Sequence, residues 1–244
     1  GTDVTSFKFG KQSDQGREEG KMLLNYVAGQ FAFFDIGGVY DDPKGPIRHF
    51  TISSSPTENF IMFSTRIRDS PYKKRLSTLE EGARVKVRGP EGQFVLHDED
   101  YSKKSAVFLS GGIGVTPFRS MIKYATDKQL PLKIVMFDSN RNRESILFKK
   151  EFDDWATINK NLKIIYTISE EQQQSSSSTA NDWKGEYGRI DKTMILKYLD
   201  TNMLNNSLFY ICGPPSMLKA MQSLLQDNLE IPKERIKVEE FTGY

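Results

Sequence analysis

The stretch FLSGGIGVTPFRSM (residues 108–121) decides how this chain folds. Its apolar beginning leads into a glycine-rich turn, and the turn leads into PFRSMIKYATDK (117–128), whose apolar residues recur at helical spacing. Strand, glycine turn and helix in this order are typical of a unit that binds a dinucleotide. The common form of that turn is G-x-G-x-x-G, yet here Gly112 and Gly114 are followed by Pro117 where the third glycine would stand.

The residues of this turn suit a phosphate-bearing ligand. Gly111, Gly112 and Gly114 let the backbone bend sharply and approach a ligand closely. Pro117 is compatible with the first turn of a helix, where no needed N–H is lost. The helix N-terminus offers free N–H groups and the positive end of its dipole to a pyrophosphate. A plain strand–turn–helix connection has the same pattern, so the turn alone leaves both interpretations open.

The spacing of apolar residues divides the chain into two halves. In residues 1–100, short runs separated by Gly/Pro turns predict a small antiparallel β-barrel or sandwich. After about residue 101, strands alternate with helices, which predicts a doubly wound parallel sheet. We therefore expect two domains, 1–101 and 102–244. The expected strands are 4–9, 31–36, 49–54, 60–67, 84–89, 106–109, 132–140, 162–168 and 208–213, and the expected helices are 117–128, 144–156 and 216–227.

Composition excludes several kinds of protein. The net charge of +2 gives no reason to expect nucleic acid or an anionic membrane as a partner. The single cysteine excludes an internal disulfide and a Cys-ligated cluster, and two histidines argue against a His-built metal site. No apolar stretch is long enough to cross a bilayer, so we expect no membrane span within this chain and a cytoplasmic location. The tract EEQQQSSSST (170–179) is interpreted as a solvated loop.

Two further segments carry chemistry-bearing residues. YICGPPSM (210–217) places Cys212 at the end of a strand, before a rigid Gly-Pro-Pro turn. RHFTISSSP (48–56) combines an arginine with alternating aromatic and hydroxyl residues, which suits a phosphate and a ring. Taken alone, Cys212 is more often a buried small residue than a reactive group, and RHFTISSSP is more often an ordinary edge strand.

RHFTISSSP, GGIGVTP, CGPP and the C-terminal VEEFTGY, in this order, resemble the ferredoxin–NADP⁺ reductase-like flavoprotein superfamily. The resemblance covers nearly the whole chain. It does not include the first strand of the family's barrel, so we expect that a segment upstream of this sequence is missing. The resemblance implies an N-terminal FAD-binding barrel and a C-terminal NAD(P)-binding domain, and WKGEYGRID (183–191) is interpreted as structural.

The resemblance assigns flavin contacts to the first half. Arg48 would pair with the flavin phosphate, Phe50 would lie against the isoalloxazine, and Thr51 would offer its hydroxyl near the flavin N5. Phe50 replaces the family's tyrosine, so stacking is kept and a hydroxyl contact is lost. A basic cluster, 73–75, would hold the pyrophosphate, although it is also compatible with a solvated face. The expected flavin contacts are Arg48, His49, Phe50, Thr51, Ser64, Thr65, Arg66, Lys73, Lys74 and Arg75.

The resemblance also places the nicotinamide nucleotide on the glycine turn. Thr116 would lie near the nicotinamide and Cys212 beside its hydride-donating carbon, C4. Glu239 and Phe241 match the family's terminal acidic-x-aromatic element, with Tyr244 as an alternative ring cover. The expected catalytic residues are Thr51, Cys212 and Glu239. The expected nucleotide contacts are Gly112, Gly114, Thr116, Pro117, Ser139, Arg141, Arg143, Cys212, Gly213 and Pro214, with Phe241 over the ring.

The choice between NADPH and NADH depends on the segment after residues 133–138. Two arginines, Arg141 and Arg143, with Ser139 suit the 2′-phosphate of NADPH, whereas Asp138 suits the ribose hydroxyl of NADH. Glu144 would neutralise either arginine by pairing with it. The sequence therefore favours NADPH and leaves NADH open.

The expected activity is hydride transfer from NAD(P)H to FAD, followed by electron transfer to an acceptor. No acid–base pair is required, because the cofactors carry the chemistry and the protein positions them. The acceptor would be a ferredoxin, a haem protein, an oxygenase component or free flavin. Two alternatives stay open: a non-catalytic flavin-binding electron-transfer subunit, and a domain of a larger, upstream-anchored reductase.

Overall fold

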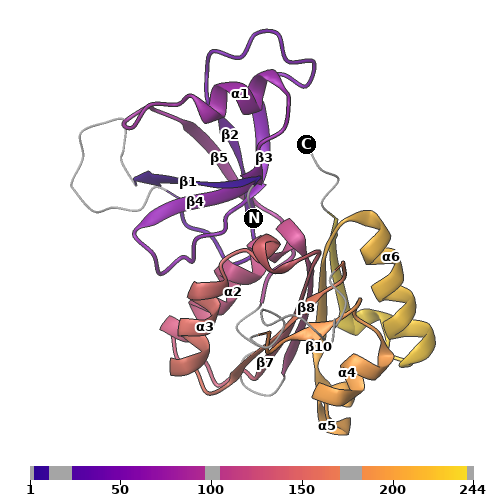
Figure 1. Cartoon of the computed structure of the whole chain (residues 1–244). Helices are drawn as coiled ribbons and strands as arrows, with labels where there is room; N and C mark the ends of the chain where they lie inside the picture. Colours follow the sequence, from indigo (N-terminus) through magenta and orange to yellow (C-terminus); the bar gives the residue numbers. More distant parts are fainter. Residues whose placement is uncertain (1–2, 11–23, 97–104, 171–182, 241–244) are drawn as a thin grey trace.

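The computed structural model describes residues 3–10, 24–96, 105–170 and 183–240. An antiparallel β part lies above a parallel α/β part, and the two meet along one edge of the parallel sheet (Figure 1). The predicted domain boundary at residues 101 and 102 lies outside the described residues.

The β part holds two antiparallel sheets, of order β1-β4 and β3-β2-β5. Strand β2 alternates between buried and half-buried residues, because Ala32 and Phe34 face the interior. Phe34, Phe50 and Phe63 pack with Tyr72 into the aromatic core between the sheets. The elements are β1 (Val4–Gly10), β2 (Phe31–Asp35), β3 (Ile47–Thr51), β4 (Phe60–Arg66), α1 (Pro71–Ser77) and β5 (Lys86–Glu91).

The α/β part is built on a parallel sheet of order β11-β10-β6-β7-β8-β9. Its central strands β6 and β10 are buried along their whole length, as their unbroken apolar sequences require. The strands are β6 (Ala106–Gly111), β7 (Ile134–Asn140), β8 (Leu162–Ile168), β9 (Glu186–Tyr187), β10 (Leu208–Gly213) and β11 (Ile236–Glu240).

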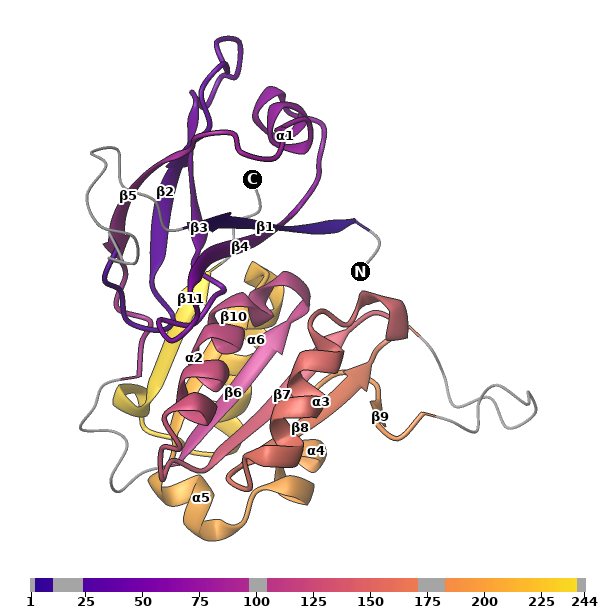
Figure 2. The ribbon, with the colours of Figure 1, turned by 90° about the vertical axis from the view of Figure 1, so that its left-hand side faces the viewer.

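Helices cover both faces of this sheet. Figure 2 shows α2 and α3 in front of it, α6 behind it and α5 below it. Phe118 of α2 and Phe152 of α3 pack into one core, whereas Ile195 of α4 and Leu218 of α6 pack into the other. The helices are α2 (Thr116–Asp127), α3 (Lys149–Ile158), α4 (Lys192–Tyr198), α5 (Thr201–Asn206) and α6 (Pro215–Ser223). None of the helices in the described part of the chain has the length and apolar character that crossing a membrane requires.

One predicted helix begins later than its sequence pattern indicates. The pattern predicts a helix over 144–156, but α3 spans Lys149–Ile158. The Asn142 side chain caps a short 3₁₀ turn at Arg143–Ser145, and Phe148 has a left-handed φ of 55°. Ile146 and Leu147 are buried in the segment between them, so they continue the apolar spacing without being helical.

Candidate functional site

A cavity of about 840 Å³ lies where the β part meets the carboxyl ends of the parallel strands. Parallel α/β sheets bind ligands at this edge. Strands β3 and β4 form one wall, and the segments after β6, β7, β8 and β10, with β11, form the other. The structure brings these expected residues together in its lining: His49, Phe50, Thr51, Ser64, Thr65, Arg66, Gly112, Thr116, Ser139, Arg141, Pro214 and Glu239.

The glycine turn adopts a shape that requires its glycines. Gly112 has a φ of +54°, and a Cβ on Gly114 would lie 2.3 Å from the Cys212 carbonyl oxygen. Pro117 occupies the first turn of α2, as predicted. Gly114, Pro117 and Gly213 therefore shape the turn without lining the cavity.

Cys212 lies beneath the cavity rather than in its wall. It is fully buried in the core, on β10 between Ser110 of β6 and Glu239 of β11. Burial, reinforced by the Glu239 charge, raises the pKa of the Cys212 thiol well above its ordinary value. The thiol is therefore protonated at neutral pH and does not act as a nucleophile.

Glu239 reaches the cavity from β11. Burial raises the pKa of its carboxyl to about 7. Its Oε2 is buried and has no hydrogen-bond partner among the described residues. A group in this state can exchange a proton near neutral pH or bind a ligand donor.

Phe50 has neighbours within the β part that the flavin-stacking prediction did not include. Its ring stacks on Phe63 at 4.2 Å, and the Lys73 Nζ lies 4.5 Å from its centroid. The ring is therefore packed against Phe63 and Lys73 within the β part, although Phe50 also lines the cavity, and its stacking on a flavin stays a prediction. Thr51 ends β3 in the cavity wall, and the contact of its hydroxyl with the flavin N5 stays a prediction.

Arg48 also differs from expectation, because its guanidinium is occupied within the protein. It forms a buried ion pair with Asp42 at 2.5 Å and donates to the carbonyl oxygens of Lys44, Gly45 and Ile47. Arg48 faces the interior of the β part because inward and outward residues alternate along β3. In this structure it holds the loop before β3 and does not line the cavity.

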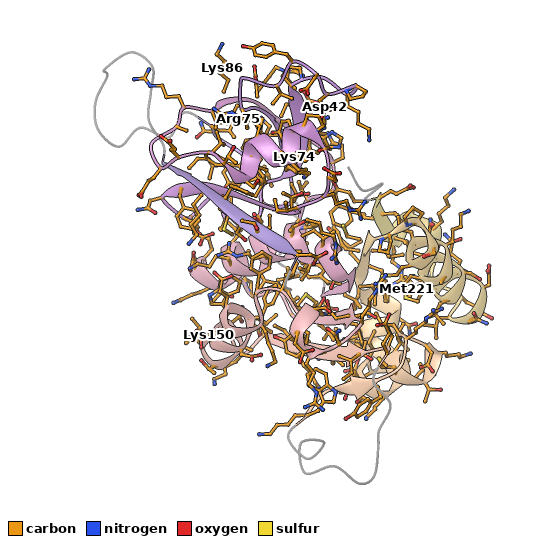
Figure 3. All side chains as sticks on the ribbon, turned by 45° about the horizontal axis from the view of Figure 1, so that its top comes forward. Asp42, Lys74, Arg75, Lys86, Lys150 and Met221 are labelled. Atoms are coloured by element: carbon orange, nitrogen blue, oxygen red, sulfur yellow. The ribbon has the colours of Figure 1, made fainter. Side chains whose placement is uncertain are left out.

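The basic cluster 73–75 divides into one buried and two exposed side chains. The Lys73 Nζ donates to the Thr65 hydroxyl, and burial, with the Arg48 and Arg68 charges, lowers the pKa of Lys73 to about 7. Lys74 pairs with Asp69 at 2.6 Å on the surface. Figure 3 shows Lys74 and Arg75 on α1, away from Met221 on the α/β part. None of the three lines the cavity.

The tip of β7 is arranged differently from either sequence hypothesis. Asp138 is fully buried and bonded to Ser110 and Asn140, so it does not reach the cavity. Arg141 pairs with Glu170, not with Glu144, at 3.5 Å. The Arg143 guanidinium lies 5.4 Å from the Trp183 ring centroid and outside the cavity lining.

Sequence reasoning missed several lining residues. Ser169 and Glu170 directly follow β8, so the rule that ligands bind at strand ends would have found them. Arg189 and Ile190 belong to the segment interpreted as structural. Met217 lines the cavity from α6 and had no distinctive signal. Phe241 and Tyr244, the two expected ring covers, lie outside the described residues.

The lining fits a nicotinamide nucleotide. The glycine turn and the α2 N-terminus lie beside two buried acceptor atoms without a partner in the described structure, Glu239 Oε2 and Asn140 Oδ1. Hydroxyl and amide groups of a nucleotide can donate to such atoms. On the opposite wall, Thr51, Ser64 and Thr65 offer hydroxyls to a second ligand.

Comparisons with known proteins agree with this arrangement. Residues 108–223 match the family of oxidoreductase NAD-binding domains. The chain is 30% identical over 232 residues to a subunit of the Na⁺-translocating NADH-quinone reductase of Pseudoalteromonas atlantica, covering 88% of this chain and 53% of that protein. The chain spans about half the length of the curated relatives it matches.

Solved structures share the two-part fold. The FAD/NAD-binding domain of nitric oxide dioxygenase from Vibrio cholerae superposes with a TM-score of 0.76 at 18% identity, covering 98% of this chain and 92% of that chain. A Neisseria gonorrhoeae ferredoxin NADP⁺ reductase with bound FAD and NADP superposes with a TM-score of 0.69 at 16% identity, covering 98% and 93%.

Proposed function

We propose that this chain, which has the fold of the ferredoxin–NADP⁺ reductase-like flavoproteins and an oxidoreductase NAD-binding domain at residues 108–223, binds FAD and a nicotinamide dinucleotide and carries electrons between them. One observation carries the proposal. A single cavity joins the hydroxyl-bearing ends of β3 and β4 to the glycine turn before α2, so two ligands can meet there.

Residues on the two walls would hold the cofactors. On the β part, Thr51 and Thr65 would contact the flavin, and the buried Lys73 Nζ donates to the Thr65 hydroxyl. On the α/β part, Gly112 and the α2 N-terminus would hold the dinucleotide phosphates, with Thr116 beside them. When bound, the nicotinamide supplies a hydride and the flavin accepts it, then releases electrons singly or in pairs.

The protein's own contribution is positioning and control of protons. The thiol of Cys212 and the Ser110 side chain are buried below the turn, so they support it from the core. Glu239, with its pKa near 7, can hold or give up one proton at the cavity. No further acid or base is needed, because the cofactors carry out the hydride transfer.

The electrons would pass onward to a separate acceptor or to a further domain of the same protein. Relatives of this chain are named as a quinone reductase subunit and as flavohemoproteins, which suggests a redox protein or quinone as acceptor. Because the chain spans about half of those relatives, the reductase unit of a larger protein is the second candidate. We retain 1–101 and 102–244 as the proposed division into flavin and nucleotide domains.

The test is the colour and reduction of the purified protein. We expect a yellow protein that releases FAD on denaturation, and whose flavin absorbance is bleached by NADH or NADPH in the absence of oxygen. Addition of an artificial acceptor such as ferricyanide then gives turnover. A protein that cannot be reconstituted with FAD would contradict the proposal, and bound FAD that neither nucleotide reduces would support only the electron-transfer alternative.

A further inference from the structure

The amide of Asn140 presents an unused hydrogen-bond acceptor at the cavity. Asn140 ends β7, is 4% exposed and lines the cavity. Its Nδ2 donates to Asp138 Oδ2 at 2.9 Å, while its Oδ1 is buried without a hydrogen-bond partner in the described structure. An unpaired buried acceptor is costly, so a ligand that donates to it gains affinity.

The orientation of this amide is fixed by the carboxyl group below it. Asp138 accepts from the Ser110 hydroxyl at 2.5 Å through Oδ1 and from Asn140 through Oδ2. A carboxylate only accepts hydrogen bonds, so the Asn140 amide must turn its NH₂ group toward Asp138 and its oxygen away. Although burial raises the pKa of Asp138 to about 6, the group remains mainly ionised at neutral pH.

A second acceptor, Glu170, lies beside Asn140. The end of β8 is tied to the end of β7, because Ser169 N donates to Asn140 O at 3.0 Å and Glu170 N donates to Arg141 O at 2.9 Å. Glu170 lines the cavity and pairs with the Arg141 Nε at 3.5 Å. The Glu170 carboxylate therefore compensates the positive charge of Arg141, which a 2′-phosphate would need as its partner.

We propose that Asn140 and Glu170 read the ribose of the dinucleotide and make this chain selective for NADH over NADPH. The inference rests on the proposed function and names the substrate of that site. The 2′-hydroxyl of NADH can donate to an acceptor oxygen, whereas the 2′-phosphate of NADPH brings only oxygen atoms and negative charge. Arg189, an exposed cation of the same cavity, is assigned to the diphosphate that both nucleotides share.

The test measures binding of NAD⁺ and NADP⁺ to the flavin-loaded protein by calorimetry, and kcat/KM with NADH and NADPH. We expect wild type to prefer NAD⁺ by about tenfold or more. Asn140→Ala should weaken the binding of NAD⁺ about tenfold and change the binding of NADP⁺ little. Glu170→Gln removes the ion pair of Arg141 and should strengthen the binding of NADP⁺ severalfold. Glu144→Gln removes an exposed carboxylate of the same loop that does not line the cavity, and it should leave both affinities unchanged.

The possible outcomes separate a failure of the proposed NADH selectivity from a failure of the proposed function. Equal affinities, or a preference for NADP⁺, overturn the selectivity and leave the proposed function standing. An equal loss of both nucleotides in Asn140→Ala places Asn140 at a shared part of the dinucleotide and also overturns it. If neither nucleotide binds wild type, the proposed function itself fails. Should Asn140→Ala not fold, Glu170→Gln decides alone, because that side chain is exposed.

Discussion

At the scale of single residues, Glu239 carries an energetic cost that changes with pH. Burial raises the pKa of its carboxyl from 4.5 to about 7. The folded protein therefore binds this proton more tightly than the unfolded chain does. It follows that the free energy of unfolding falls as pH rises from about 4.5 to about 7.

We expect Glu239→Gln to stabilise the protein at pH 8 and to change it little at pH 4. The amide cannot ionise, so the variant avoids the cost of a buried charge, on the order of 1–3 kcal/mol. Urea unfolding at the two pH values measures the difference. Glu240→Gln, an exposed neighbour on β11, is the control and should show no such pH dependence. Equal stability of Glu239→Gln and wild type at pH 8 would show that the carboxylate is well solvated.

At the scale of elements, helix α1 is attached to the β part through a buried lysine. Ser70 caps α1, and its side chain accepts from Lys73 N. The Lys73 side chain runs into the aromatic core and ends between the Phe50 ring and the Thr65 hydroxyl. A lysine with its pKa lowered to about 7 is less stable charged in the folded protein than in the unfolded chain. Stability therefore rises with pH between about 7 and 10.5.

We expect Lys73→Met to stabilise the flavin-free protein at pH 7 by about 1 kcal/mol and to weaken FAD binding about tenfold or more. A buried cation that is costly without an anion suits the flavin diphosphate. Thermal unfolding of the apoprotein and titration with FAD measure the two effects. Lys74→Met, which changes the exposed neighbour, should alter neither. If Lys73→Met binds FAD as wild type does, Lys73 is a structural residue of α1.

The elements also show what the sequence could predict. Strands 162–168 and 208–213 were predicted to the residue, because buried parallel strands have unbroken apolar runs with clear ends. Helices α4 and α5 were missed, although Asp191 and Asp200 cap them and gave a usable signal. The wall that holds Gly112 and Thr116 was predictable, because the carboxyl ends of parallel strands meet at one edge of a sheet, whereas Thr51 on the opposite wall was named through the resemblance.

Side-chain pairing within the site was not predictable in the same way. Arg48 was assigned to phosphate, but Asp42, six residues earlier, occupies it in this structure. Glu144 was considered as the partner of Arg141, but Arg141 pairs with Glu170, which lies in the segment after the neighbouring strand β8. Such pairs depend on loop geometry and on contacts across the sheet, which residue spacing along the chain does not contain.

At the scale of the whole molecule, one buried arginine joins the two walls of the cavity. Arg119 of α2 is 1% exposed and pairs with Glu58 of the β part at 2.9 Å and with Glu151 of α3 at 2.5 Å. It also donates to the Ser53 carbonyl, while Ser120 donates to that of Ser54. Segment 53–58 continues from Thr51, and α2 begins at Thr116. Arg119 therefore sets the separation of the residues proposed to hold the flavin and the nicotinamide.

We expect Arg119→Ala to lower the free energy of unfolding by about 3–5 kcal/mol, because it takes the guanidinium away from the partly buried Glu58 carboxylate and from the buried Ser53 carbonyl oxygen. Urea unfolding measures this loss. Lys123→Ala, on the same helix, removes only a partly exposed pair with Asp127 and should cost less than about 1 kcal/mol. Adding Glu58→Gln to Arg119→Ala removes the negative charge that Arg119 compensated and should recover part of the loss. If Arg119→Ala is no more costly than Lys123→Ala, the two parts are held together by apolar packing such as that of Phe94 against Phe118, and the ion pairs only follow it.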